Sequence, residues 1–479
     1  MNHGRTSPRT APLTDGFVNG GVSFWYRDGG PPGRRPALPG DRDYDVAIVG
    51  GGYTGLWTAY YLARDRPGLR IAVLEREFAG FGASGRNGGW LYHGFAGARE
   101  RYAAQHGRPA VREMQRTLFR SVDEVISVAH AEGIDAGIHK GGMLRVAVGP
   151  AQQARLLAAV EDQRDWGFTE ADLRLLDATE RAERVPVAGA SAAAWTPHAA
   201  AVQPAALASG LARAVAARGV DILEGTTVTE ILPRNAGGRA VARTDRGRVT
   251  ADYVIRATEG FSANIAGLRR QWLPMNSSMI VTEPLSDAVW ERIGWRNREV
   301  LGDTAHAYIY AQRTADGRIA LGGRGVPYRF GSRTDTGGVT RPQTVDALWR
   351  ALVTLFPPAA DSAVEHAWCG VLGVPRDWCS TVRLDHTTGL GWAGGYVGSG
   401  VTTSNLAGRT LRDLLLRQDT ELTALPWVGR QVRPWEPEPL RWAGVHLIHA
   451  LFRAADRRES AGLPHTSAFA RLAGVISGR

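Results

Sequence analysis

Residues 45–62 read D-V-A-I-V-G-G-G-Y-T-G-L-W-T-A-Y-Y-L, and residues 71–75 read I-A-V-L-E. The first apolar run, 46–49, predicts a buried parallel strand. Gly50, Gly52 and Gly55 follow it at G-x-G-x-x-G spacing, and the segment 56–63 predicts a helix. A second apolar strand ends in Glu75, 20 residues after Gly55. A strand, a glycine turn, a helix and a terminal acid in this order predict a dinucleotide-binding site.

Each part of this motif has a physical task. The glycines turn the chain, let the backbone approach a pyrophosphate and let the helix pack closely on the strand. The N-terminus of the helix attracts the phosphates, because its first N–H groups have no partner within the helix. The carboxylate of Glu75 is suited to accept hydrogen bonds from a ribose. The motif alone leaves NAD(P) and FAD open.

Length and composition limit the class of protein. A chain of 479 residues with 44% hydrophobic residues predicts two or three units with ample core. Two cysteines exclude a disulfide framework and favour a reducing compartment. The first 40 residues lack the apolar segment of a secretory signal, and no apolar run is long enough for a membrane span. We therefore expect a soluble, cytoplasmic protein.

The charge is strongly positive, at +10. A nucleic-acid-binding protein is disfavoured, because the arginines are spread along the chain and no basic run is interleaved with aromatic residues. Lys140 is the only lysine. Since arginine stays protonated, these cations cannot readily serve as proton-accepting bases.

The apolar patterns also predict how the chain is organised. Helices are expected at 98–132, 151–166 and 203–218, and strands at 142–148, 221–224, 227–231 and 252–258. The last three strands would extend the first sheet. Residues 308–312 and 319–323 flank Asp316-Gly317 and predict a hairpin in a second, antiparallel domain. Residues 391–400 predict a strand and glycine turn, followed by a helix over 401–417 that returns to the nucleotide.

The two ends of the chain differ in character. Residues 1–43 are rich in glycine and proline and predict an extended arm that packs through Phe24, Trp25 and Tyr26. Residues 440–452 form an amphipathic stretch in which Leu440, Trp442, Val445, Ile448 and Phe452 share one side. Packing of this stretch onto the body of the protein or onto a second subunit is favoured over attachment to a membrane surface.

A second glycine-rich loop favours FAD over NAD(P). Residues 79–89 read A-G-F-G-A-S-G-R-N-G-G. Its many small residues leave backbone N–H groups free to surround an anion or approach a ring, Arg86 adds a fixed positive charge, and Asn87 adds a donor and an acceptor. A flavin needs close backbone contact, and a positive charge near its pyrimidine edge stabilises the reduced, anionic form. A nicotinamide enzyme has no evident need for this loop.

Four motifs in order now carry a resemblance: 50–55 with Glu75, G-A-S-G-R-N-G-G at 82–89, R-A-T-E-G at 256–260, and G-G-Y-V-G-S-G-V at 394–401. Over about residues 44–418 the chain resembles the D-amino-acid oxidase family of FAD-dependent oxidoreductases, in its glycine, sarcosine and gamma-glutamylputrescine oxidase branch. The resemblance implies a mixed α/β fold. It comprises a Rossmann-like FAD domain from 44–100, 185–265 and 366–420 and an antiparallel-sheet substrate domain from 101–184 and 266–365. The remaining residues, 421–479, are predicted from the sequence to form a helical tail.

The resemblance also implies the cofactor-binding residues. Val228 would lie near the adenine, and Gly395 to Val401 would lie at the pyrimidine edge of the flavin. The complete implied set is Gly50, Gly52, Gly55, Glu75, Arg76, Ser84, Arg86, Asn87, Gly88, Gly89, Val228, Ala257, Gly395, Gly398, Gly400 and Val401.

The chain departs from the family pattern at several places. It has Glu259 where the family usually shows the asparagine of A-T-N-G, and V-P-R-D-W at 374–378 replaces a T-P-D segment. Monomeric sarcosine oxidases place an oxygen-activating lysine above the flavin, whereas the matching hairpin here offers Gly322-Gly323-Arg324. Cys369 falls within about one residue of the flavin-linked cysteine of covalently flavinylated sarcosine oxidases. A buried cysteine and non-covalent FAD are favoured over a thioether link.

The function expected from these features is oxidation of a C–N bond of an amine or amino acid to an imine. A hydride would pass to flavin N5, with reoxidation by O2 or another electron acceptor. The candidate catalytic residues are Arg324, Tyr310, His93 and Tyr308, and Arg324 or Arg376 is a candidate to hold a carboxylate. A structural role for His93 and a core position for the two tyrosines are left open.

Two alternative functions remain. One is a flavin-dependent monooxygenase, which is disfavoured because no late G-D-A-type segment is found. The other is a non-catalytic flavin-binding protein. The sequence leaves open which amine is used, its stereochemistry and whether the protein forms a homo-oligomer, and it indicates no metal.

Overall fold

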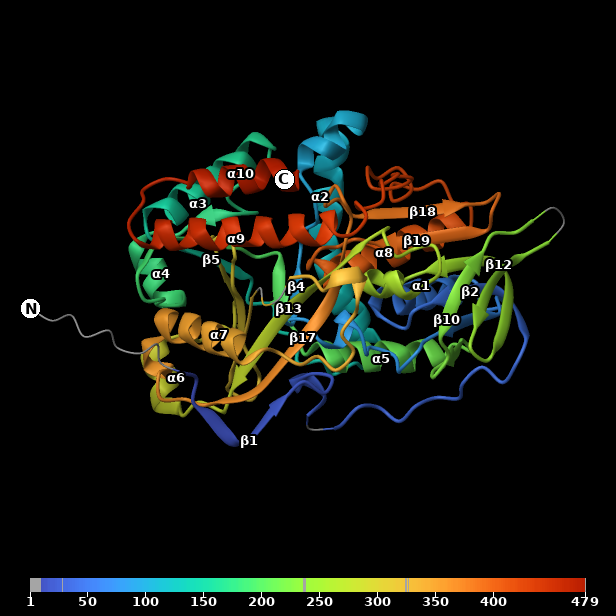
Figure 1. Ribbon diagram of the computed structural model, residues 1–479, viewed down its shortest axis with the longest axis horizontal. Coiled ribbons are helices and arrows are strands. Elements are labelled where there is room, and N and C mark those ends of the chain that lie inside the picture. The colour runs from blue at the N-terminus through green and yellow to red at the C-terminus, as the bar shows by residue number, and fades with distance from the viewer. Residues whose placement is uncertain (1–9, 28, 236–237, 324, 326, 479) are drawn as a thin grey trace, which may run out of the picture.

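A computed structural model describes residues 10–27, 29–235, 238–323, 325 and 327–478. Two large sheets occupy the two halves of the molecule, and helices surround them (Figure 1). One sheet has eight strands and includes the strand that precedes the glycine motif, and the other sheet has nine strands. A separate two-stranded ribbon pairs β4 (Trp90–Tyr92) with β8 (Ala199–Ala201), and β4 lies near the centre of the molecule (Figure 1).

The eight-stranded sheet has a parallel core. β2 (Arg42–Val49) pairs in parallel with β3 (Ile71–Leu74) and β12 (Gly247–Arg256), β3 pairs with β9 (Asp221–Leu223), and β12 pairs with β19 (Leu390–Gly394). This arrangement confirms the predicted Rossmann-like sheet and the strands expected to extend it. The strand order is β10 (Val228–Leu232), β11 (Ala240–Thr244), β12 (Gly247–Arg256), β2 (Arg42–Val49), β3 (Ile71–Leu74) and β9 (Asp221–Leu223), with β19 (Leu390–Gly394) on β12 and β18 (Thr381–Asp385) on β19.

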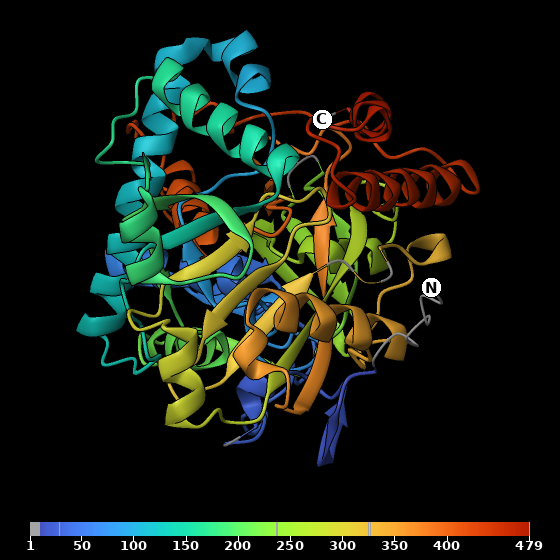
Figure 2. The same cartoon turned by 90° about the vertical axis from the view of Figure 1, so that its left-hand side faces the viewer.

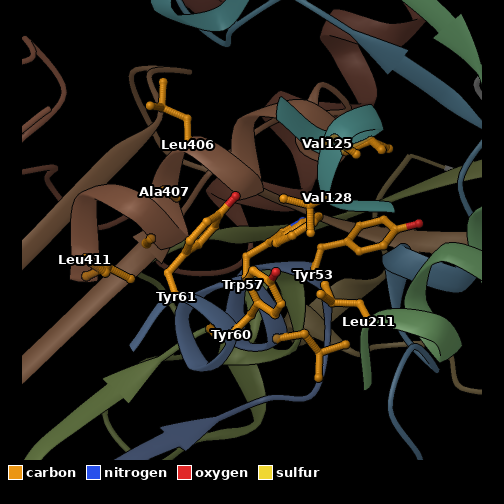
Figure 3. Close-up of a cluster of buried hydrophobic side chains, with 14 of the residues drawn as sticks. Tyr53, Trp57, Tyr60, Tyr61, Val125, Val128, Leu211, Leu406, Ala407 and Leu411 are labelled. Carbon is orange, nitrogen blue, oxygen red and sulfur yellow. The ribbon is translucent and has the colours of Figure 1, made fainter. Parts of the chain in front are cut away.

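Four helices form the layer that supports the glycine motif: α1 (Tyr53–Asp65), α2 (Arg99–Ala131), α5 (Pro204–Ala216) and α8 (Gly400–Leu415). Figure 3 shows the aromatic side chains of α1 packed among Leu406, Ala407 and Leu411 of α8, Leu211 of α5 and Val125 and Val128 of α2. Trp57 is fully buried, and burial of one such side chain is worth about 1.5–3 kcal/mol. The helix α1, whose N-terminus faces the cofactor site, is therefore held in place by its packing against α2, α5 and α8.

The nine-stranded sheet is mainly antiparallel, as predicted, but the β1–β17 and β14–β5 pairs are parallel. Figure 2 shows α7 (Pro342–Leu355) and α6 (Asp287–Ile293) against this half. The strand order is β1 (Leu13–Asn19), β17 (Val364–Val374), β13 (Leu273–Thr282), β16 (Ile319–Gly323), β15 (Tyr310–Arg313), β14 (Val300–Asp303), β5 (Met143–Val148), β7 (Ala190–Thr196) and β6 (Arg174–Leu175).

Two strands do not follow the predicted domain division. Residues 190–196 and 366–374 were assigned to the cofactor domain, whereas β7 and β17 lie in the nine-stranded sheet. β17 pairs with β13 along its whole length, from Val374 opposite Leu273 to Val364 opposite Thr282. An apolar run predicts a strand but not the sheet that it joins. The domain boundaries could therefore be defined only from these long-range strand pairings.

The N-terminal arm packs as the aromatic patch predicted. Phe24, Trp25 and Tyr26 form a single buried 3-10 turn beside Trp368 of β17. The strand β1 before it also adds an edge to the nine-stranded sheet. The helix predicted at 98–132 is α2, with a break at Gly107, where φ is 76°. Two further helices are α3 (Pro150–Asp165) and α4 (Ala178–Arg184).

The tail forms two helices, α9 (Leu440–Ser460) and α10 (Ala468–Ser477), which lie together on the outside of the molecule (Figures 1 and 2). The predicted apolar side is only partly correct. Val445 is buried, but Leu440 and Trp442 are 65% and 40% exposed. No helix in the described parts of the chain is both long enough and apolar enough to span a membrane.

Candidate functional site

A cavity of about 170 Å³ opens where β2, β3 and β12 end. Ligands of open parallel sheets bind at such carboxyl ends. We call it the glycine-loop cavity. Its lining comes from the first turn of α1, the loop after β3, the segments 226–228 and 257–265, residues 371–372 of β17 and the turn before α8. Six segments far apart in the sequence therefore meet at one site.

The glycines of the motif are required by close backbone approaches. Gly50 has a φ of 107°, and a Cβ there would lie 2.7 Å from the Ala257 carbonyl oxygen. A Cβ at Gly55 would lie 2.0 Å from the Gly50 carbonyl oxygen. Gly55 therefore does not line the cavity but allows α1 to pack against the turn, as the motif predicts.

The N-terminus of α1 is suited to an anion. Its N-cap is Gly52, which has no side chain to bond the first N–H groups of the helix. Ser84 Oγ accepts a hydrogen bond from the Tyr53 N–H at 2.8 Å and so ties the second glycine loop to this turn. The remaining first-turn donors and the helix dipole favour a phosphate group here.

Glu75 lies at the end of β3 and lines the same cavity. Its Oε2 accepts the Gly51 N–H at 2.8 Å and its Oε1 accepts the Glu77 N–H at 2.9 Å. Burial raises the pKa of this carboxyl group, while the two N–H donors act in the opposite direction. The position matches the acid that accepts ribose hydroxyls in dinucleotide sites.

Arg86 and Asn87 shape the second glycine loop. Asn87 Nδ2 donates to the Ser84 carbonyl at 2.8 Å, and its Oδ1 accepts the Gly89 N–H at 2.8 Å. The buried guanidinium of Arg86 donates to three carbonyl oxygens, those of Phe81 at 2.9 Å, Thr336 at 3.0 Å and Cys369 at 3.3 Å. Burial lowers the pKa of Arg86. The loop thus holds a desolvated positive charge.

A second cavity, of about 460 Å³, adjoins the first. The two cavities share Ala83, Asn87, Leu372, Gly398 and Val401 as lining residues. We call the second one the tyrosine cavity. Its other polar and aromatic lining residues are Arg86, Trp90, Tyr92, Arg145, Arg155, Ser277, Asp303, Thr304, Tyr308, Tyr310 and Ser399.

The two predicted tyrosines both line this cavity. Tyr310 lies over Gly88, since a Cβ there would be 2.7 Å from its ring, and its hydroxyl is 2.9 Å from Ser277 Oγ. Tyr308 was expected on the same strand. It lies instead in the loop before β15, is 37% exposed and also borders a third cavity.

Two charged residues that the sequence did not single out also line the tyrosine cavity. Asp303, at the end of β14, accepts backbone N–H groups of Ile309, at 3.0 Å, and of Ala305. Burial raises the pKa of Asp303 to about 7. Arg145 lies on the adjacent β5, and its Nη2 donates to Tyr92 Oη at 3.0 Å. Arg145 lies in the strand predicted at 142–148, whereas no strand was predicted at Asp303, and no local motif marks either residue.

Most predicted cofactor-binding residues line the glycine-loop cavity. They are Gly50, Gly52, Glu75, Arg76, Ser84, Asn87, Val228, Ala257, Gly398, Gly400 and Val401. Arg86 and Gly88 line the tyrosine cavity instead. Gly55, Gly89 and Gly395 line neither and pack against backbone or side chains nearby.

Two other candidate site residues that the structure describes, His93 and Arg376, do not line the tyrosine cavity. His93 is held by Gln115, whose Nε2 is 3.1 Å from its Nδ1, and packs beside Phe119. Burial lowers the pKa of His93 well below its usual value, which keeps the ring neutral. Arg376 is paired with Glu436 at 3.0 Å and lines the third cavity. Arg324 lies outside the described residues.

Glu259, which replaces the expected asparagine, forms hydrogen bonds to two segments that lie far along the chain. Its carboxylate accepts the N–H of Gly373, at 2.8 Å, and of Tyr396, at 3.2 Å. Burial raises the pKa of Glu259 to about 7, and the residue itself has a φ of 44°. It therefore joins the end of β17 to the glycine turn beside the cavity.

Comparison with known proteins agrees with this geometry. A family model described as FAD dependent oxidoreductase matches residues 45–414. Gamma-glutamylputrescine oxidoreductase of Escherichia coli (strain K12) is 32% identical over 384 residues, which cover 79% of this chain and 84% of that protein.

Two solved structures share the fold. The crystal structure of glycine oxidase from Geobacillus kaustophilus has a TM-score of 0.64 at 24% identity and covers 81% of this chain and 99% of its own. L-proline dehydrogenase from P. horikoshii has a TM-score of 0.64 at 20% identity, with coverages of 81% and 98%. The family match spans the dinucleotide motif, the second glycine loop and the turn before α8, which together line the glycine-loop cavity. The chain therefore belongs to the DAO family of FAD-dependent oxidoreductases.

Proposed function

We propose that this enzyme oxidises the C–N bond of an amine or amino acid to an imine, with the substrate bound in the tyrosine cavity. The observation that carries the proposal is the adjoining of the two cavities, which share five lining residues. A flavin ring reaching from the glycine-loop cavity would then form one wall of the tyrosine cavity. Two of the relatives are named for an amine or an amino acid, gamma-glutamylputrescine and glycine.

The residues present fit FAD. Glu75 would bond the ribose, the N-terminus of α1 would face the pyrophosphate, and Val228 would lie at the adenine. Arg86 to Gly88 and Gly398 to Val401 would surround the flavin ring. When bound, FAD supplies N5 as a hydride acceptor and can then pass its electrons to O2 or another acceptor.

The charged lining of the tyrosine cavity suggests how an amine would be prepared. Oxidation needs a neutral nitrogen lone pair, whereas most amines are ammonium ions at neutral pH. Asp303, with its pKa near 7, is suited to accept that proton. Among the described residues, Arg145 has Tyr92 Oη as its hydrogen-bond acceptor and retains donors for a substrate carboxylate. Tyr310 and Trp90 would supply apolar walls.

The fold alone does not identify the electron acceptor, because solved structures with this fold include both an oxidase and a dehydrogenase. The single lysine, Lys140, is paired with Asp123 at an exposed position and does not line the tyrosine cavity. We propose O2 as the acceptor, in a cavity whose described lining contains no lysine.

The test is anaerobic reduction of the bound flavin by a panel of amines, each with and without a carboxylate. We expect bleaching near 450 nm with at least one amine, and peroxide when air is admitted. Bleaching by NADPH alone would favour a monooxygenase. A flavin that no amine or amino acid reduces would support a non-catalytic role and reject the proposal. Bleaching without peroxide would identify a dehydrogenase.

Non-covalent binding of FAD is a separate expectation. Cys369 Sγ lies 3.8 Å from the Val339 carbonyl oxygen and 4.0 Å from Asp335, and the residue lines neither cavity. Burial raises the pKa of this thiol to about 11, so the reactive thiolate is scarce at neutral pH. Acid precipitation should leave a colourless pellet and a yellow supernatant, and Cys369→Ser should behave identically. A yellow wild-type pellet that turns colourless in Cys369→Ser would establish a thioether.

A further inference from the structure

The loop 304–309 separates the tyrosine cavity from a third cavity. Thr304, Ala305, Tyr308 and Ile309 line the tyrosine cavity. His306, Ala307 and Tyr308 line the third one, of about 220 Å³, together with residues of α9, and we call it the tail cavity. Figure 1 shows α9 lying across this half of the molecule. The loop is thus shared between the substrate side and the tail.

Asp456 of α9 bonds the loop backbone directly. Its Oδ1 accepts the His306 N–H at 2.9 Å and its Oδ2 accepts the Ala307 N–H at 2.9 Å. The ring of Phe452, one helical turn earlier, stacks on the His306 ring at 5.7 Å with an angle of 13°. Two charge-assisted bonds and a stacked ring therefore fix the residues that immediately precede Tyr308.

Glu459, on the next turn of α9, connects the tail to the cavity wall. Its buried Oε1 accepts His306 Nε2 at 2.9 Å, and its Oε2 accepts Arg155 Nη1 at 2.6 Å. Arg155 lines the tyrosine cavity and also donates through Nε to the Thr304 carbonyl at 2.8 Å. A continuous chain of hydrogen bonds runs from the tail, through Arg155, to the start of the loop.

His306, Asp456 and Glu459 lie close enough together to hold a cation, with ligand atoms within 4.8 Å of one another. Their carboxylate oxygens, however, already accept N–H donors from the loop, from Arg155 and from Ser467. We therefore interpret the cluster as a hydrogen-bond network. Asp456 and Glu459 also lie outside the family match, which ends at residue 414, so the family relationship assigns these two residues no role.

We propose that Asp456 and Glu459 are positioning residues of the substrate site, acting through the loop 304–309 and Arg155. Without these bonds the residues next to His306 and Ala307 would lose their fixed conformation, and Tyr308 would be displaced from the cavity wall. The substrate would bind less tightly, while the flavin and its electron transfer would change little. The inference rests on the proposed function, because it takes the tyrosine cavity as the substrate site.

The test uses the flavin-loaded full chain with Asp456→Asn. Asparagine offers one carbonyl oxygen and turns an NH2 group toward the second N–H donor, so one of the two bonds is lost. The matched control is Arg457→Gln, which removes an exposed charge from the next position on α9. We expect KM for the best amine to rise about tenfold, the value of one lost charge-assisted bond, with kcat within about twofold. The control should match the wild type.

Hydrogen exchange provides a readout that does not need a substrate. In Asp456→Asn the amides of His306 and Ala307 should exchange at least about tenfold faster than in the wild type, while the peptide covering the glycine motif is unchanged. Glu459→Gln should show the same pattern, and Asp456→Glu, which keeps the carboxylate, should restore much of the wild-type KM. Unchanged exchange, or faster exchange with unchanged KM, would overturn the proposal. A wild-type flavin that no amine reduces would instead reject the proposed function, and the exchange measurement would still decide whether the tail holds the loop.

Discussion

Gly55→Ala is expected to abolish FAD binding. The added Cβ would lie 2.0 Å from the Gly50 carbonyl oxygen and 3.1 Å from Ile48 Cγ2. The methyl group has no rotamer that relieves this overlap, so α1 must move away from β2 and from the turn that carries Gly50. That turn and the N-terminus of α1 face the cofactor, and displacement of about 1 Å would weaken several phosphate bonds together.

The measurement is the ratio of flavin to protein after purification, followed by titration of the apoprotein with FAD. We expect at least a 100-fold loss of affinity, equivalent to about 2.8 kcal/mol. Gly68→Ala is the matched control, because a Cβ at Gly68 would meet no atom within 4 Å. Circular dichroism separates loss of the cofactor from loss of the fold. A folded Gly55→Ala protein that binds FAD as the wild type does would contradict this account of the motif.

Asp303→Asn is expected to have the largest effect on catalysis among changes that leave FAD bound. Asp303 is the carboxylate at the end of β14, and its Oδ1 is fixed by the Ile309 N–H. An asparagine keeps an acceptor for that bond but cannot take a proton from the substrate ammonium. Loss of a general base typically costs 10² to 10⁴-fold, so we expect kcat/KM at pH 7.5 to fall about 100-fold.

The pH profile distinguishes this role from a structural one. Because burial raises the pKa of Asp303 to about 7, the carboxylate is protonated below that pH and cannot accept a proton. In the wild type kcat/KM should therefore rise as the pH passes through about 7. In Asp303→Asn this rise should disappear and be replaced by one nearer the pKa of the free amine, about 10 for a primary alkylamine. A variant with an unchanged profile and an unaltered rate would reject Asp303 as the base.

The cofactor half could be predicted from sequence because its signals are local. A strand, a glycine turn and a helix within some 30 residues define the geometry of β2, α1 and β3, and the loop that contains Arg86 follows at once. The resemblance then joined segments as distant as Val228 and Gly398 to the same site. Arg86 shows the limit of this approach. Its charge was expected, but its three bonds to carbonyl oxygens depend on strands and loops far along the chain.

The substrate half was less predictable because its contacts are long-range. Asp303, Arg145 and Arg155 come from strands and a helix that no motif connects. The pairing of β14 with β5 brings the first two together, and Arg155 reaches the same cavity from α3. His93 is a different case. A histidine that follows a cofactor loop suggests chemistry, but its ring is held by Gln115, packs beside Phe119 and does not line the tyrosine cavity. The hairpin at Arg324, from which most was expected, contains the one candidate catalytic residue outside the described residues.

The long strand β17 limits how the two halves of the enzyme can move relative to each other. Its first residues pair with the N-terminal arm, its middle lies against the second glycine loop through the Trp368 Nε1 bond to the Arg86 carbonyl, and its end is bonded to Glu259. Figure 1 shows β13 and β17 crossing the molecule from one half to the other. A strand with these bonds resists a hinge motion between the two halves. We therefore expect the substrate to enter and leave through the movement of short surface segments, without closure of one half onto the other during turnover.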